Sequence, residues 1–232
     1  MFKSKFVFAL FAAATLYLSG CGGGGGDSGT TIAVTSFPLQ AGYKARISAG
    51  AADNFSISGT CTGTANFTTG AATTATFEGV AGYAAPQTVT INLTNCTPAS
   101  NAVTGTSYYD SNYTPLGSTI PGVEYAKFLT QPPAIPTSVK VGDTAVYATL
   151  NTYTDSTKTT STGQRILSYV IESDTSVSAI ANLISKQYNL ASQLLFTQQT
   201  KYRLTADGSL TIISIDIQYS TTSTNHLLYT KS

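Results

Sequence analysis

Short segments of alternating apolar and polar residues dominate the second half of the chain. The clearest covers residues 210–219, where apolar side chains recur at every second position. This period is typical of a β-strand with one buried and one solvated face. The predicted buried face consists of Ile213, Ile215, Ile217 and Tyr219. Asp207 and Gly208 form a hairpin signal, so we expect this strand to pair with residues 194–204.

Further segments of the second half follow the same pattern. Residues 143–153, 164–172 and 225–231 each read as a strand bounded by polar, turn-forming residues. In the first of these, the two predicted faces are Val146, Ala148 and Leu150, and Tyr147, Thr149 and Tyr153. Residues 177–188 fit a helical stripe as well as a strand, and their hairpin-like neighbours favour the strand. We therefore predict an antiparallel β-meander of about six strands, a curved sheet or partial barrel.

The first half of the chain contains shorter alternating pieces between Gly-containing turns. The pieces are residues 32–34, 43–47, 55–57, 73–77 and 88–93. Short strands at this spacing are expected of an antiparallel sandwich or open barrel. The fold class is therefore mainly β, with a sandwich-like N-terminal domain ahead of the meander.

A proline cluster separates the two halves. Pro132, Pro133 and Pro136 fall within seven residues, 131–137. Prolines stiffen the chain and cannot donate to a sheet ladder. We expect a linker here, between a domain at 31–130 and a domain at 138–232.

The first twenty residues have the layout of a secretory signal peptide. Lys3 and Lys5 precede a mostly apolar run at residues 6–18, which is too short to span a bilayer. The following residues, Leu18-Ser19-Gly20-Cys21, resemble the lipobox of bacterial lipoproteins. The resemblance implies cleavage before Cys21, acylation of Cys21 with chains such as palmitate, and a membrane partner reached through this anchor.

A glycine run follows the lipobox. Residues 22–26 are all Gly, and residues 21–30 as a whole offer almost nothing to pack, which predicts a tether. In the lipoproteins of Gram-negative bacteria, Gly rather than Asp after the acylated Cys directs sorting to the outer membrane. The resemblance therefore implies a lipid-anchored outer-membrane protein.

Two cysteines remain once Cys21 is acylated. Cys61 and Cys96 would lie in an oxidising compartment, where a disulfide is the expected state. A zinc site would need further ligands beside them, so we predict no metal.

Composition and charge exclude some classes of function. Without Lys3 and Lys5, ten basic residues balance eleven acidic ones, and they are scattered rather than gathered into the basic face that a nucleic-acid binder needs. The one histidine, His226, and the pair Glu172 and Asp174 are the strongest catalytic candidates, and each is more often structural or solvated. We predict neither an enzyme nor a cofactor.

The densest aromatic cluster is the remaining candidate site. Tyr108, Tyr109 and Tyr113 surround Asp110 in a turn-rich stretch. Exposed aromatic rings with a carboxylate can bind a glycan, although burial is the commoner use of aromatic side chains.

The body of the chain resembles uncharacterised envelope lipoproteins of Gram-negative bacteria, which implies no activity and no site residues. Our leading hypothesis is a non-enzymatic binding or structural lipoprotein. Two alternatives stay open: a carrier that holds an apolar ligand in the curved sheet, by analogy of fold, and a surface module that binds glycans.

Overall fold

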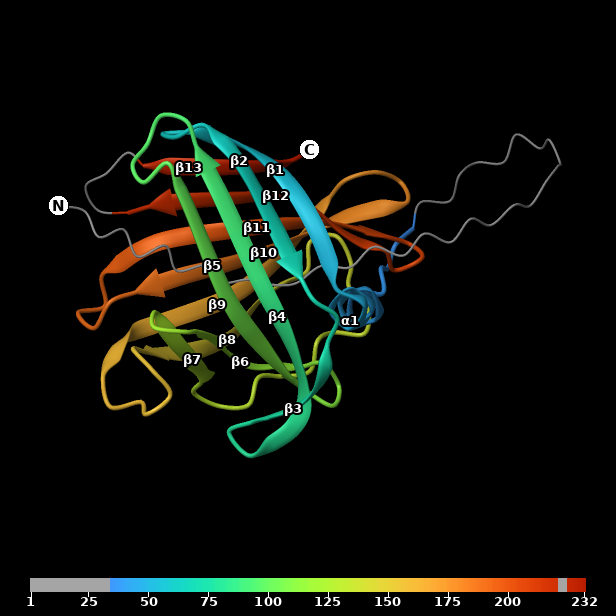
Figure 1. Ribbon diagram of the computed structural model, residues 1–232. Coiled ribbons are helices and arrows are strands. Elements are labelled where there is room, and N and C mark those ends of the chain that lie inside the picture. The colour runs from blue at the N-terminus through green and yellow to red at the C-terminus, as the bar shows by residue number, and fades with distance from the viewer. Residues whose placement is uncertain (1–33, 221–224) are drawn as a thin grey trace, which may run out of the picture.

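A computed structural model describes residues 34–220 and 225–232 of the chain (Figure 1). It contains one helix, α1 (Leu39–Ala49), and is otherwise built of β-strands, which confirms the mainly β prediction. The strands are β1 (Ala51–Gly59), β2 (Gly63–Thr69), β3 (Thr73–Phe77), β4 (Val80–Leu93), β5 (Ser100–Asp110), β6 (Pro115–Ile120), β7 (Glu124–Phe128), β8 (Thr144–Tyr153), β9 (Ser161–Ser173), β10 (Ser178–Tyr188), β11 (Leu194–Thr205), β12 (Leu210–Tyr219) and β13 (His226–Lys231).

The strands form one antiparallel sheet that closes on itself. From β4 to β13 each strand pairs with the next, β13 pairs with β1, β1 with β2, and β2 returns to β4. Strand β3 is the exception, because it pairs only with β4, along residues 80–84, beyond the residues of β4 that pair with β2. The result is a closed barrel of twelve strands, where the sequence predicted a sandwich and a curved sheet or partial barrel. Alternation specifies strands and their faces, but it does not say which edges meet.

The proline-rich residues 131–137 connect β7 to β8, and these two strands pair directly. On the other side of the ring, β1 pairs with β13. The structure therefore places strands from both predicted domains in the same sheet.

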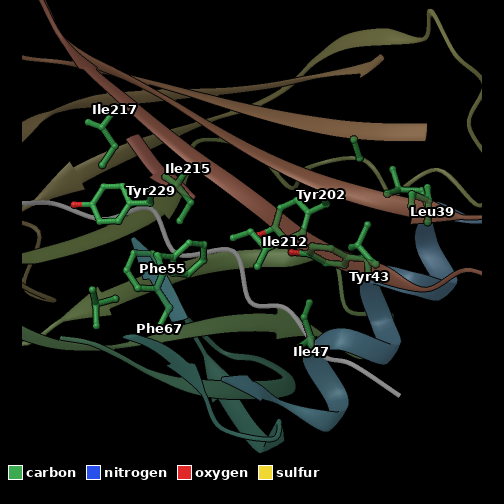
Figure 2. Close-up of a cluster of buried hydrophobic side chains, with 14 of the residues drawn as sticks. Leu39, Tyr43, Ile47, Phe55, Phe67, Tyr202, Ile212, Ile215, Ile217 and Tyr229 are labelled. Atoms are coloured by element: carbon green, nitrogen blue, oxygen red, sulfur yellow. The ribbon is translucent and has the colours of Figure 1, made fainter. Parts of the chain in front are cut away.

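Aromatic and aliphatic side chains fill the interior of the barrel. Phe55, Phe67 and Tyr229 lie together, with the ring centroids of Phe55 and Phe67 4.9 Å apart (Figure 2). The intervening positions of β1 and β2 carry polar residues such as Asn54 and Asn66, whose side chains hydrogen-bond on the outer face. This alternation of apolar inside and polar outside is what places the core within the ring.

Helix α1 lies at one end of the barrel and corrects a prediction (Figure 1). The sequence suggested a strand at residues 43–47, but the helix covers them. Leu39, Tyr43 and Ile47 are four residues apart, so they share one helical face, and all three are buried in the core (Figure 2). A short segment with apolar residues at both spacings satisfies either pattern, and here packing against the barrel selects the helix.

Arg46 connects α1 to strands β1 and β12 through hydrogen bonds. Its guanidinium donates to the Asp53 carboxylate of β1 at 2.6 Å and to the Leu210 carbonyl of β12 at 3.2 Å. Desolvation lowers the pKa of this buried arginine, and the charge of Asp53 opposes that effect. Lys231 of β13 donates to the same carboxylate at 2.7 Å. Three elements, α1, β1 and β13, are thus joined through one buried carboxylate, and Arg46 also links α1 to β12.

Two β-bulges change the predicted faces of strands. In β8 the pairing with β9 passes from Val146 to Ala148, so Tyr147 has no partner and Val146 turns outward, 73% exposed. In β12 the pairing with β11 passes from Ile212 to Ser214. The buried face is therefore Ile212, Ile215 and Ile217, in place of the predicted face that began at Ile213. One extra residue in a strand moves every later side chain to the other face.

The remaining predictions for the second half agree with the structure. Residues 177–188 are covered by strand β10, and the Asp207-Gly208 turn joins β11 to β12 as an antiparallel hairpin. The one helix that the structure describes is not long and apolar enough to cross a membrane.

Candidate ligand pocket

A pocket lies inside the barrel, between α1 and strands β8 to β11. The space among its lining side chains totals about 670 Å³, a figure that includes solvent outside the enclosed part. Its walls come from α1, the linker, β8, β9, β10, β11 and the first residue of β12. Helix and linker therefore complete a pocket that the strands alone would leave open.

The walls are mainly apolar. Leu167 and Leu183 line one side, and the rings of Tyr43 and Tyr202 approach from the helix and from β11 (Figure 2). Burial raises the pKa of both tyrosines, so their hydroxyls are neutral at physiological pH. A ligand enclosed here would meet aliphatic and aromatic carbon over most of its surface.

Ser185 is one of four polar residues that line the pocket, with Ser168, Gln198 and Thr200. Its side chain projects from β10 into the pocket, between Leu167 of β9 and Gln198 of β11, and the residue is only 4% exposed. Its Oγ atom is buried and has no hydrogen-bond partner in the described part of the chain. Buried polar groups are nearly always paired, so such a hydroxyl needs an explanation.

The linker between β7 and β8 borders the mouth of the pocket. Ile135 and Pro136 line it, and the Pro136 carbonyl accepts a hydrogen bond from the backbone of Gln40 at the start of α1. Tyr147 reaches the linker from β8, where its hydroxyl donates to the Pro133 carbonyl. Burial raises the pKa of Tyr147, with a smaller contribution from the Asp110 carboxylate, which keeps this donor protonated.

A second hollow, of about 400 Å³ when open solvent is included, adjoins the pocket and shares Leu167 with it. Arg165 of β9 lines this hollow and donates two hydrogen bonds to the Glu124 carboxylate, at 2.8 and 3.0 Å. It also donates to Gln187 at 3.0 Å. Arg165 and Glu124 are both buried and neutralise each other, so this pair leaves no net charge for an ionic ligand.

Two of the predicted glycan-binding tyrosines are buried. Tyr109 points into the barrel and meets Tyr43 edge to face, with ring centroids 6.3 Å apart. Tyr113 stacks on Tyr83 at 4.6 Å. Both rings are therefore engaged in packing, and Tyr109 contributes to the second hollow.

The other two predicted residues lie apart from that pair. Tyr108 stacks on Phe77 of β3 at 4.5 Å, in a small cluster outside the ring. Asp110 accepts hydrogen bonds from the backbone N–H groups of Asn112 and Thr114, both at 2.8 Å, and so closes the turn between β5 and β6. The four residues do not form one exposed platform.

The predicted disulfide is present. Cys61 and Cys96 are bonded, with Cα atoms 5.8 Å apart, and they join the β1–β2 turn to the loop after β4. The other predicted modification, acylation of Cys21, lies outside the described residues, as do the signal segment and the glycine run.

The catalytic candidates weighed from the sequence lie on the outer face. Glu172 forms an ion pair with Lys201 at 2.7 Å, and Asp174 pairs with Arg203 at the same distance. His226 contacts Asp216 at 2.9 Å. Within residues 34–220 and 225–232, no three His, Cys, Asp or Glu side chains gather in a way that could hold a metal ion.

Fold and pocket together define a closed antiparallel barrel whose interior holds an apolar pocket with one unpaired hydroxyl. No protein-family model, curated protein or solved structure matches the chain. Sequence analysis missed Ser185, although a signal was present: small and polar residues alternate along 179–187 with the isoleucines of the opposite face.

Proposed function

We propose that this chain is a binding protein of the bacterial envelope, without catalytic activity, and that its barrel holds one small, largely apolar molecule in the pocket beside α1. The observation that carries the proposal is the unpaired, buried hydroxyl of Ser185 in an apolar wall. Leaving such a group unsatisfied costs about 1–3 kcal/mol. A bound molecule that hydrogen-bonds to Ser185 removes this cost.

The chemistry of the interior selects the ligand. Arg165 and Glu124 neutralise each other, and the tyrosine hydroxyls around the pocket are uncharged. A charged ligand would lose its hydration without gaining a counter-charge there. We therefore infer a ligand with an apolar body and one neutral polar group, such as an alcohol, aromatic amine, amide or carbonyl.

The anchor is the second part of the proposal, and the sequence supports it. Leu18 to Cys21 resemble a lipobox, and acyl chains on Cys21 would hold the barrel at the outer membrane. Each buried methylene contributes about 0.8 kcal/mol, so several chains give a stable attachment. A Cys21→Ser variant should leave the membrane fraction and lose labelling by palmitate. Continued fractionation with membranes would contradict the anchor.

The pocket is tested with N-phenyl-1-naphthylamine, a neutral aromatic probe with one N–H donor. We expect its fluorescence to rise on addition of the purified protein and to saturate at one probe per chain. Ser185→Phe fills the pocket and should abolish this rise. Lys186→Phe is the matched control, because Lys186 is the next residue on β10 and is exposed on the outer face.

Thermal unfolding should first show that both variants fold. Equal probe binding by the two Phe variants would place the probe elsewhere, and absence of binding by the unmodified protein would contradict a hydrophobic pocket. Turnover of envelope glycans by the purified protein would contradict a purely binding role.

A further inference from the structure

The chain enters the barrel at the end where the pocket opens. The backbone N–H of Val34 donates to the Ser176 carbonyl at 2.8 Å, in the turn between β9 and β10. Phe37 and Val139 exchange two backbone hydrogen bonds, at 2.8 and 2.9 Å, just after the linker that borders the mouth. The segment that leads back toward Cys21 therefore leaves beside the pocket mouth.

Exposed apolar side chains surround the same end. Val146, at the start of β8, is 73% exposed, and Leu129, Val141 and Val177 are each about half exposed. Leu129 directly follows β7, Val141 precedes β8, and Val177 lies in the β9–β10 turn. Each of these elements begins or ends at the α1 end of the barrel. Exposed apolar side chains that gather at one place mark a contact surface.

The length of chain between Cys21 and Val34 indicates that the lipid bilayer covers this surface. Cys21 and Val34 are thirteen positions apart in the sequence, and the chain between them spans at most about 45 Å when fully extended. Strand β10 alone has 11 residues and is about 36 Å long. This chain joins the barrel at the α1 end, and a flexible chain of thirteen residues averages roughly 20 Å between its ends, less than the length of β10. An acylated Cys21 therefore keeps the α1 end, on average, nearer to the bilayer than the opposite end.

We infer that the α1 end of the barrel is a membrane-contacting surface and that the pocket takes its ligand from the lipid bilayer. Leu129, Val141, Val146 and Val177 contact the acyl boundary around the mouth. The ligand is then a membrane amphiphile whose apolar body passes the linker and whose neutral polar group reaches Ser185. This inference rests on the proposed function for the identity of the pocket, but its contact surface can be tested separately.

The chain contains no Trp, so one introduced indole reports its own surroundings. Val146→Trp places it at the α1 end. Leu190→Trp is the matched control, because Leu190 is equally exposed, at 71%, and lies in the β10–β11 turn at the opposite end. The lipidated variants are bound to phosphatidylethanolamine–phosphatidylglycerol vesicles with brominated acyl chains.

We expect the emission of Val146→Trp to shift to shorter wavelength and to be quenched by the brominated lipid. The emission of Leu190→Trp should stay that of a solvated indole. Equal quenching of the two variants, or no quenching of Val146→Trp, would overturn the membrane contact.

A second measurement separates this inference from the proposed function. The triple variant Val141→Asp, Val146→Asp, Val177→Asp should bind N-phenyl-1-naphthylamine from solution with unchanged affinity. It should take the probe up from loaded vesicles at least several-fold more slowly. Unchanged uptake would overturn the membrane inference without contradicting the pocket. If the unmodified protein did not bind the probe from solution at all, the proposed pocket itself would be wrong.

Discussion

The hydroxyl of Tyr147 donates a hydrogen bond of 2.7 Å to the carbonyl oxygen of Pro133. This contact joins the edge of the pocket on β8 to the linker that passes its mouth. The bulge between Val146 and Ala148 makes it possible, because it turns the ring of Tyr147 away from the outer face. Prolines in the linker restrict other movements of the backbone. The Tyr147 hydrogen bond is the side-chain contact that holds the linker at the mouth, beside the backbone hydrogen bond from Gln40 to Pro136.

Removing that hydrogen bond should make the pocket easier to enter and leave. For Tyr147→Phe we expect N-phenyl-1-naphthylamine to associate and dissociate several-fold faster, with an affinity that changes little. Stability should fall by only about 0.5–1.5 kcal/mol, the usual net value of one hydrogen bond. Stopped-flow fluorescence measures the two rates.

Tyr153→Phe is the control for this substitution. Tyr153 also lies on β8, but its hydroxyl contacts Asn151 near the outer cluster, away from the mouth. Its rates should match those of the unmodified protein. Identical rates for Tyr147→Phe would show that the linker does not limit access.

Replacing Ser185 by Ala should have opposite effects on stability and on binding. The substitution removes a buried hydroxyl that has no partner, so the free energy of unfolding should rise by about 1 kcal/mol. The affinity for N-phenyl-1-naphthylamine should fall about 5- to 10-fold, because the probe's N–H loses its acceptor. Urea unfolding and fluorescence titration give the two quantities. A loss of stability would mean that the hydroxyl has a structural partner.

Most of the strands could be predicted from the sequence, because residues of their inner and outer faces alternate. Strand β3 matches the predicted residues 73–77, and β11 and β12 match the predicted hairpin closely. Closure of the barrel could not be predicted, since it depends on the pairing of β2 with β4 across the excursion of β3. Nothing in the local pattern of residues 63–69 distinguishes that partner from others.

The pocket could not be predicted because it depends on which face of β10 points inward. Ile180 and Ile184 lie opposite the outward residues Glu172 and Ser168, so the isoleucines face away from the interior. Ala181 and Ser185 take the inner positions. Small side chains on the inner wall leave space that larger ones would fill, and only the closed ring shows that this is the inner wall.

Gly42 of α1 packs against the β11–β12 turn. A Cβ atom at this position would lie 2.4 Å from the Gly208 carbonyl oxygen, closer than atoms can approach. Gly42→Ala should therefore destabilise the protein and displace α1 from the pocket, with weaker probe binding. The direction of the change in stability is diagnostic, since replacing Gly by Ala inside a helix otherwise stabilises by up to about 1 kcal/mol. A stabilised variant with unchanged binding would show that α1 is not held this closely.

The Cys61–Cys96 disulfide lies far from the pocket. It closes a segment with a sequence separation of 35 at the end of β1 that is remote from α1 (Figure 1). Cross-links of this kind typically stabilise a fold by about 2–4 kcal/mol, mainly by restricting the unfolded chain. The double variant Cys61→Ser, Cys96→Ser should lose stability of this size, and calorimetry should record a melting temperature lower by roughly 5–15 °C.

Binding should respond differently from stability in that variant. The strands that line the pocket, β8 to β11, carry neither cysteine, and α1 is held by Arg46, Asp53 and Lys231 at the other end of the barrel. Well below the melting temperature, the affinity for N-phenyl-1-naphthylamine should therefore equal that of the oxidised protein. If the affinity fell together with stability, the shape of the pocket would depend on the disulfide at the opposite end of the barrel, and ligand binding would be coupled to that end.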